Sequence, residues 1–400
     1  MNRFPWKTIM LPALMLVLSA SAWSASSKKI SVHDLSDLLT SLQDSKKSDA
    51  EVATQLKQVE LTEELTTATM NTLTDKIPGP LSTEQLYVLE ARSAVLPPPA
   101  SDLPSAPAPD AAAQTAMLAK AADFATKTYP QLPHLTATRL TGRFQDGVEA
   151  IHTYTGANHN LSQDDDPLWE QTRLYVRLLG THTDTVESEN GIEKLPAAKD
   201  KTAWGANGQV TSVGTGIALS TILQEATASG SPKWLRWETI NGKQTAVYAF
   251  AIDKKKTHFA VNYCCFPNTD TAGLVNYGSG PSTGGGATGS NFQTVSEWKP
   301  FKSNVGYHGE IFIDPETGTV VRTITMANFK PSDFVHFEAI RTDYAPRPIG
   351  GKSMVVPVRS FTIVEVVPNG DSFAAHYSVR HQFVTEDYKD YQLAGATAQK

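Results

Sequence analysis

The sequence predicts an α+β protein, with a small N-terminal helical bundle followed by a curled, half-barrel-like antiparallel β-sheet with covering helices. Three observations lead to this prediction. Apolar residues recur with helical spacing up to about Leu96. A Pro/Ala-rich stretch then interrupts the pattern. Beyond Leu132 the apolar period changes from about 3.6 to about 2, and two-residue hairpin signals separate the segments.

The chain opens with the pattern of a secretory signal peptide. Arg3 and Lys7 precede an apolar run from Ile9 to Leu18, and small residues follow around Ala20 and Ala22. A run of about 10 residues is too short to span a bilayer, which takes about 20. We therefore expect cleavage after Ala22 and a periplasmic or secreted mature protein. An uncleaved membrane anchor is the alternative.

Four short helices are expected next. The first is indicated by leucines at i, i+3, i+4 and i+7, namely Leu35, Leu38, Leu39 and Leu42. Ser48 and Glu51 form a capping box for the second helix, and a third helical run follows Leu61. Ser82 and Gln85 repeat the capping box for the fourth. Structural packing is the expected role of this bundle, with a peptide-binding groove as the alternative.

The Pro/Ala-rich stretch, PPPASDLPSAPAPD, is typical of a linker with polyproline II character. Another helix is expected from Ala111 to about Lys127. Four dipeptides then signal hairpin turns: Asn190-Gly191, Asn241-Gly242, Gly350-Gly351 and Asn369-Gly370. The strand containing Phe383 alternates apolar residues with polar ones such as Gln382, which predicts one wet face.

The predicted organisation covers the whole chain. It comprises a signal peptide (1–22), a helical bundle (23–96), a linker (97–110), a helix-covered antiparallel β domain (111–392) with a mobile Gly/Ser-rich loop (267–292), and a tail (393–400).

The strand from Ala246 to Ile252 is apolar on both faces. Tyr248, Phe250 and Ile252 share one face, and a predicted helix with Ile222 and Leu223 is its expected cover. We therefore expect an apolar ligand to bind among these five residues. The alternative is ordinary core packing, because apolar faces are usually satisfied by core.

Charge argues against a nucleic-acid partner. The formal net charge is −6, and Lys254 to Lys256 form the only basic run. A phosphate backbone requires a clustered basic surface. We expect the three lysines to lie in a solvated turn.

Cysteine usage excludes a disulfide framework, because only Cys264 and Cys265 occur. Strand alternation predicts that Cys265 points inward and Cys264 outward. A structural thiol beside an exposed one is the expected arrangement, and a reactive or intermolecular thiol at Cys264 is the alternative.

No motif identifies a catalytic, metal or cofactor site. His182 and Asp184 are similar to a zinc-aminopeptidase ligand pair, but the Gly that should directly precede the histidine is replaced by Thr181. Gly214-Thr215-Gly216 lacks the third glycine of a dinucleotide loop, and no Gly-x-Ser-x-Gly elbow is present. We expect no cofactor and lean against an enzyme.

Several segments resemble the outer-membrane lipoprotein carriers, in which a helix leads into a curled antiparallel half-barrel. They are the helix ending at Lys127, LPHLTATRLTGRF from Leu132, the hairpin from Trp234 to Ile252, and YHGEIFIDPETGTVVRTI from Tyr307. The likeness spans Ala111 to about Gln392 and departs from that class by the Gly-rich loop and the added bundle. Taken whole, the chain looks more like a group of uncharacterised exported bacterial proteins. The resemblance implies a concave apolar sheet face that shelters an acyl chain.

Two functions follow as expectations. The first is an exported, non-enzymatic protein of the cell envelope that binds lipid or another apolar ligand. The second is an envelope interaction or scaffold protein that docks on a protein partner through its helical bundle. An exposed concavity in the sheet favours the first function, and an apolar patch on residues 31–96 favours the second. A hydrolase ranks below both.

Overall fold

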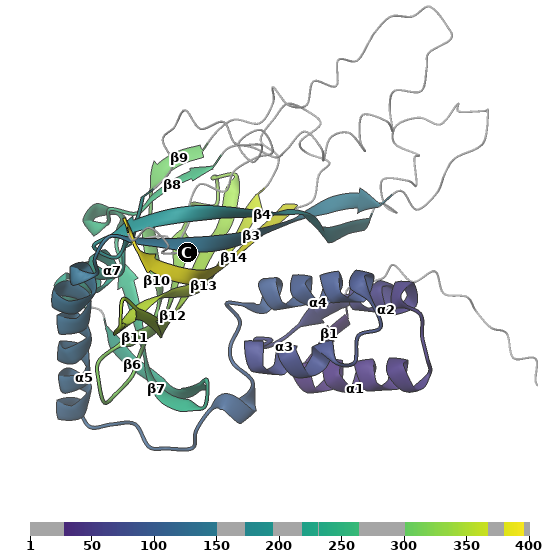
Figure 1. The fold of residues 1–400 in the computed structure, drawn as a ribbon, viewed down its shortest axis with the longest axis horizontal. Coiled ribbons are helices and arrows are strands. Elements are labelled where there is room, and N and C mark those ends of the chain that lie inside the picture. Colours follow the sequence, from purple (N-terminus) through teal and green to yellow (C-terminus); the bar gives the residue numbers. More distant parts are fainter. Residues whose placement is uncertain are drawn as a thin grey trace, which may run out of the picture.

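The computed structural model describes residues 28–149, 173–194, 218–230, 232–263, 301–366 and 380–395. Within these residues the predicted α+β class is confirmed: a helical unit, residues 28–96, lies beside a large antiparallel sheet (Figure 1). Some predicted features lie outside the described residues: the signal peptide, Gly214-Thr215-Gly216, Cys264, Cys265, the loop 267–292 and the Asn369-Gly370 turn.

The helical unit contains four helices and a short parallel ladder. Its elements are β1 (Lys28–Ile30), α1 (Val32–Asp44), α2 (Asp49–Leu56), β2 (Val59–Leu61), α3 (Thr67–Thr74) and α4 (Pro80–Ser93). The predicted capping box of Ser48 and Glu51 is confirmed at the start of α2, and Ser31 forms another with Asp34 at α1. Buried side chains of all four helices meet in one apolar core.

The predicted start of α4 is wrong by three residues. The helix begins at Pro80 with Gly79 as its N-cap, so Ser82 lies inside the first turn. Asp49 accepts hydrogen bonds from the backbone N–H groups of Leu81 and Ser82, both at 2.9 Å. A carboxylate from α2 therefore caps α4 in place of a local capping box.

The linker contacts both neighbouring parts of the chain. Glu64 N–H donates to the carbonyl of Pro97 at 2.8 Å, and the Trp237 indole donates to the carbonyl of Pro107 at 2.8 Å. After one 3-10 turn (η1, Ala100–Asp102), α5 runs over Ala111–Asp123. It continues as a π turn (η2, Phe124–Thr128) and a 3-10 turn (η3, Tyr129–Gln131).

Ten strands form the main sheet, in the order β5-β4-β3-β14-β13-β12-β11-β10-β7-β6. In chain order they are β3 (Leu135–Glu149), β4 (Arg173–Glu189), β5 (Ile192–Glu193), β6 (Lys233–Ile240), β7 (Lys243–Ile252), β10 (Gly306–Ile313), β11 (Val320–Asn328), β12 (Val335–Ile349), β13 (Lys352–Val366) and β14 (Arg380–Leu393). All neighbours are antiparallel, and the sheet curls without closing (Figure 1). A separate pair comprises β8 (Ala260–Tyr263) and β9 (Phe301–Asn304).

Three of the predicted hairpin turns are confirmed. Both residues have positive φ in Asn190-Gly191, Asn241-Gly242 and Gly350-Gly351, as a type I′ turn requires. The lysine run 254–256 forms an exposed 3-10 turn after β7, in agreement with the sequence.

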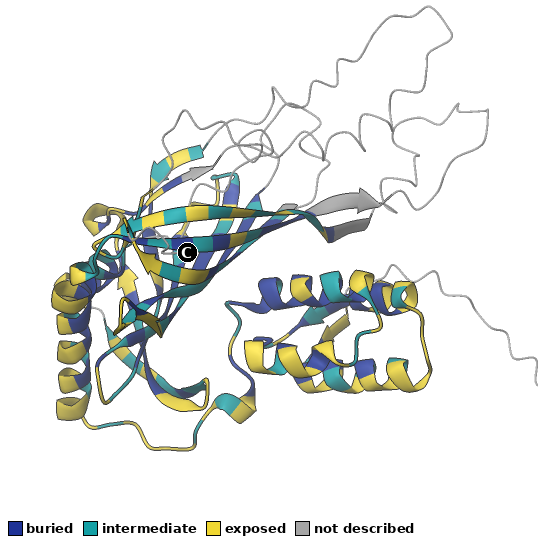
Figure 2. Ribbon diagram, in the orientation of Figure 1, coloured by how far each residue is buried: buried dark blue, intermediate teal, exposed yellow. Residues whose placement is uncertain are grey.

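Each face of the sheet is covered by a different part of the chain. One face packs against α5 and α7 (Leu219–Ala228) and carries Tyr248, Tyr307 and Ile340 in a single core. The other face packs against α4 of the helical unit. Figure 2 shows buried positions along the central strands and many exposed ones on α1 and α5. Gln382, which the sequence places on a wet face, is buried.

Candidate functional site

The five residues predicted to bind an apolar ligand come together. Tyr248, Phe250 and Ile252 of β7 meet Ile222 and Leu223 of α7 in the core between the sheet and its covering helices. All five are at most 3% exposed, and the Tyr248 hydroxyl donates to the carbonyl of Gln114 in α5 at 3.3 Å. The helices thus occupy the face on which the ligand is expected, and ligand binding there stays a prediction.

The opposite side of β7 is covered less completely. Val247 is buried against Phe312 and Ile324, and Val95 of the helical unit packs on this cluster. Ala249 is half-buried and Ala251 is exposed. The two apolar faces of this strand are therefore covered by different parts of the chain, and the α5–α7 side is the one that is buried throughout from Ala246 to Ile252.

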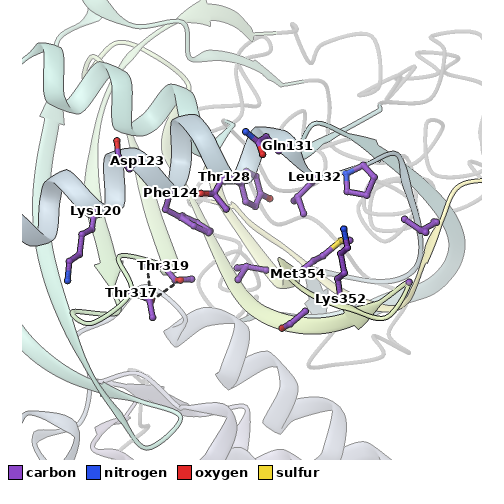
Figure 3. A pocket seen from close by; sticks show the side chains of 16 residues that line it. Lys120, Asp123, Phe124, Thr128, Gln131, Leu132, Thr317, Thr319, Lys352 and Met354 are labelled. Atoms are coloured by element: carbon purple, nitrogen blue, oxygen red, sulfur yellow. Dashed lines mark hydrogen bonds between the residues drawn. The ribbon is translucent and has the colours of Figure 1, made fainter.

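A cleft of about 810 Å³ lies at the end of the core, between α5–η3 and two hairpins of the sheet. We call it the hairpin cleft. Figure 3 shows Phe124 and Leu132 on its helical side and Met354 and Lys352 on the β12–β13 hairpin. Its apolar walls comprise Phe124, Tyr129, Leu132, Pro133, Met354, Val355 and Leu393. Phe124 and Tyr129 also belong to the core that contains Tyr248.

Two turn glycines allow the helical wall of the cleft to approach the sheet closely. Gly191 has a φ of +75°, and a Cβ there would collide with the Tyr129 ring. Gly318 has a φ of +76°, and a Cβ there would collide with Lys120 of α5. A side chain at either position would be strained twice, by its backbone conformation and by its neighbour. The contact at Gly318 fixes α5 against the β10–β11 hairpin that borders the cleft, and the contact at Gly191 fixes Tyr129 of η3 against the β4–β5 turn.

The charges around the hairpin cleft are mainly positive. Lys120 donates to the carbonyl of Glu316 at 2.9 Å, which holds its ammonium group beside the β10–β11 turn. Asp123 is paired with Lys127 at 2.7 Å. Lys352 is exposed and makes no ion pair with any residue that the structure describes. The cleft therefore combines apolar walls with cations at its rim.

A second polar feature joins the helical unit to the sheet. We call it the ionic layer; it comprises Glu64 and Glu90 of the helical unit and Arg322, Arg341, Asp343 and Arg359 of the sheet. Glu64 accepts from Arg341 Nη1 at 2.5 Å and from Arg322 Nη1 at 3.2 Å. Both oxygens of Glu90 accept from Arg359, at 2.7 and 2.9 Å. Bidentate pairs of this kind fix orientation as well as contact.

Two arginines of the ionic layer contact an aromatic ring, and burial affects the pKa values of its carboxyl groups. Arg341 and Arg359 lie over the Phe361 ring, at 5.3 and 4.7 Å from its centroid. Although burial opposes ionisation, Arg322 and Arg341 hold the pKa of Asp343 at about 2. Burial has the opposite outcome at Glu90, where it outweighs Arg359 and raises the pKa of the carboxyl group. The layer is thus a structural joint between the helical unit and the sheet.

Arg139 forms another buried cluster on the α5–α7 side of the sheet. It pairs with Asp184 at 2.9 Å, Glu193 at 2.7 Å and Glu386 at 3.3 Å, and Tyr388 donates to Glu386 at 3.1 Å. Three carboxylates share one guanidinium group. Burial, with added repulsion from Glu193, raises the pKa of Glu386 to about 7 despite Arg139.

The His182–Asp184 pair does not form a metal site with other described residues. Both lie on β4, and Asp184 is engaged by Arg139. Within the described ranges, no three His, Cys, Asp or Glu side chains converge as a metal site would require. No described helix combines the length and the apolar character needed to cross a membrane.

The sequence did not reveal the hairpin cleft. Its two available signals were Pro130, which ends the helical run, and Gly350-Gly351, which predicts the β12–β13 turn. Neither signal shows that the two segments lie side by side. Comparison of the chain with protein-family models, curated proteins and solved structures gives no match, so the candidate site stands on its geometry alone.

Proposed function

We propose that this protein is an exported, non-enzymatic binding protein of the cell envelope that holds an amphipathic anion in the hairpin cleft. The observation that carries the proposal is the cleft itself, with about 810 Å³ between apolar walls. Ligand sites are typically concave and mostly apolar, with a few polar groups that orient the ligand. The resemblance to lipoprotein carriers implies an apolar ligand of the same general kind.

The lysines at the rim of the hairpin cleft favour a negatively charged ligand. Lys120 and Lys352 border the cleft, whereas its carboxylate, Asp123, is already paired with Lys127. An apolar tail would lie along Phe124, Leu132 and Met354, and an acidic head group would meet Lys352. A neutral ligand of the same length cannot form the ion pair with Lys352, and a cationic ligand is repelled by this lysine.

Isothermal titration with dodecanoate, dodecanol and dodecylamine tests the proposal, because these probes share a chain and differ in charge. We expect dodecanoate to bind tightest and dodecylamine weakest. Replacement Lys352→Gln should weaken dodecanoate about fivefold, the range of an exposed ion pair. Lys243→Gln is the matched control, since Lys243 is exposed and also follows a two-residue hairpin turn. Equal binding of the three probes would refute the proposal that the cleft prefers an anionic ligand.

A second pair of variants tests the apolar wall. Leu393, 37% exposed, lines the cleft, whereas Leu235, 45% exposed, lies on β6 and is not among the lining residues. Leu393→Asp should weaken dodecanoate binding at least about tenfold, because it places a charge against the tail. Leu235→Asp should leave binding unchanged. The same loss in both variants would show that the cleft is not the site.

The alternative function, an envelope interaction protein, is favoured by two exposed apolar side chains of the helical unit. Leu81 and Tyr87 of α4 are 52% and 45% exposed. A photoreactive residue at position 87 should then give one discrete crosslinked product in intact cells, and the same residue at position 235 should give none. Absence of a product at position 87 argues against docking through this helix.

A further inference from the structure

A smaller crevice, independent of the hairpin cleft, opens where the helical unit meets the sheet. It has a volume of about 210 Å³ and lies between β2 and α4 on one side and β12, β13 and β14 on the other. We call it the seam crevice. Its walls come from segments almost 300 residues apart in the sequence, so it exists only while the helical unit is docked.

Each wall of the seam crevice carries one carboxylate and one nitrogen-containing side chain. The helical unit contributes Glu60 and Arg92, and the sheet contributes Glu365 and His381. His381 lies 3.6 Å from Glu365, and its ring is stacked on Phe383 with centroids 6.3 Å apart and an interplanar angle of 9°. These two contacts orient the histidine ring, which lines the crevice.

Arg92 points to a ligand. It is half-buried and lines the seam crevice, yet no hydrogen bond or ion pair joins its side chain to the part of the chain that the structure describes. A guanidinium group presents five donors in a fork that matches a carboxylate. The other arginines of the ionic layer at this seam, Arg322, Arg341 and Arg359, all have carboxylate partners.

The floor of the seam crevice is apolar. Leu89, Val95, Phe337, Ile363 and Phe383 contribute to it, and Ile363 and Phe383 are nearly fully buried. A ligand that fits these features has a carboxylate for Arg92, an ammonium group for Glu365, and an apolar side chain for the floor. The volume suits a molecule of amino-acid size.

We propose that the seam crevice binds a small zwitterion with an apolar side chain, of the α-amino-acid class. Because such a ligand contacts both walls, its binding stabilises the docked position of the helical unit. Binding here is separate from the hairpin cleft, which lies beside α5 and the β12–β13 turn.

Isothermal titration with four probes tests the proposal: L-phenylalanine, L-alanine, N-acetyl-L-phenylalanine and L-phenylalanine amide. We expect L-phenylalanine to bind and to raise the melting temperature, and the other three to bind at least tenfold more weakly, since each lacks the aromatic ring, the ammonium group or the carboxylate. If the N-acetyl compound or the amide binds as tightly as L-phenylalanine, the ligand need not be a zwitterion and the proposal is wrong. If no probe binds, the seam crevice is not a binding site for this class of molecule.

Variants assign the contact to Arg92. Arg92→Gln should abolish L-phenylalanine binding but leave dodecanoate binding and the far-ultraviolet circular dichroism unchanged. Arg347→Gln is the control, because Arg347 is exposed and its guanidinium group donates only to the carbonyl of Pro346 among the described residues. If Arg92→Gln binds L-phenylalanine as the unmodified protein does, the seam crevice is not its site.

Discussion

Arg341 of β12 donates a hydrogen bond of 2.5 Å to Glu64, across 277 residues of sequence. The same nitrogen donates to the carbonyl of Ala94 at 3.0 Å, so one guanidinium group engages two segments of the helical unit. Both side chains are only 3% exposed. Apolar side chains of the two bodies also pack together, with Val88, Ala91 and Ala94 of the helical unit against Phe361 and Phe383 of the sheet. The ionic layer adds oriented ion pairs to this apolar contact between the helical unit and the sheet.

Removal of the Glu64 carboxylate should destabilise the protein. In Glu64→Gln a buried arginine pair loses its charged partner, and we expect the free energy of unfolding in urea to fall by about 3 kcal/mol. In Glu189→Gln, which breaks an exposed pair with Lys194, we expect no measurable change. A double-mutant cycle with Arg341→Met should show strong coupling; additive effects would mean that the pair contributes nothing specific.

The raised pKa of Glu386 predicts a pH dependence. A carboxyl group whose pKa rises on folding, here to about 7, contributes stability below its unfolded pKa and loses it as the pH passes through the folded value. The unmodified protein should therefore lose about 3 kcal/mol of unfolding free energy between pH 5 and pH 8. Glu386→Gln should flatten this dependence and be the more stable form at pH 8. Glu316→Gln, at an exposed turn position, should keep the original slope.

The close contact at Gly191 predicts an unequal pair of variants. Gly191 and Gly242 have φ values of +75° and +76°, but a Cβ at Gly242 meets nothing within 4 Å, whereas at Gly191 it meets Tyr129. Gly242→Ala should cost about 1 kcal/mol of unfolding free energy for its backbone conformation alone. Gly191→Ala should cost at least twice as much and weaken dodecanoate binding, because Tyr129 must move. If the two variants lose the same free energy of unfolding, Tyr129 moves aside at no cost and the contact does not contribute to stability.

The buried position of Tyr248 predicts the result of placing a charge there. The side chain is fully buried, so Tyr248→Asp should abolish the cooperative unfolding transition measured by circular dichroism. Tyr87→Asp, at a position that is 45% exposed, should unfold like the unmodified protein. A folded Tyr248→Asp variant that no longer binds dodecanoate would instead place the ligand along β7.

The sequence predicted elements well where their signals are local. The capping box of Ser48 and the two-residue turns need only neighbouring residues, and the structure has them at the predicted positions. The start of α4 depends on Asp49, which is more than 30 residues away, and sequence periodicity does not reveal such a partner. The β1–β2 ladder, with three residues in each strand, is too short to give a period.

The sites were harder to predict than the fold, for a physical reason. Polar residues that alternate with apolar ones along a strand indicate a wet face, yet Arg322, Arg341 and Arg359 are covered because the helical unit supplies Glu64 and Glu90. The hairpin cleft likewise depends on how α5 meets turns far along the chain. Tyr248 and Phe250 were singled out correctly as a cluster with α7, but the pattern does not distinguish a core from a cavity.

The most direct test of the hairpin cleft is photo-crosslinking with dodecanoate that carries a diazirine near the end of its chain, followed by peptide mapping by mass spectrometry. The account predicts crosslinks in two segments, residues 117–133 and residues 350–356, and their suppression by excess dodecanoate. Crosslinks confined to residues 219–228 and 243–252 would contradict the hairpin cleft and place the ligand between α7 and β7.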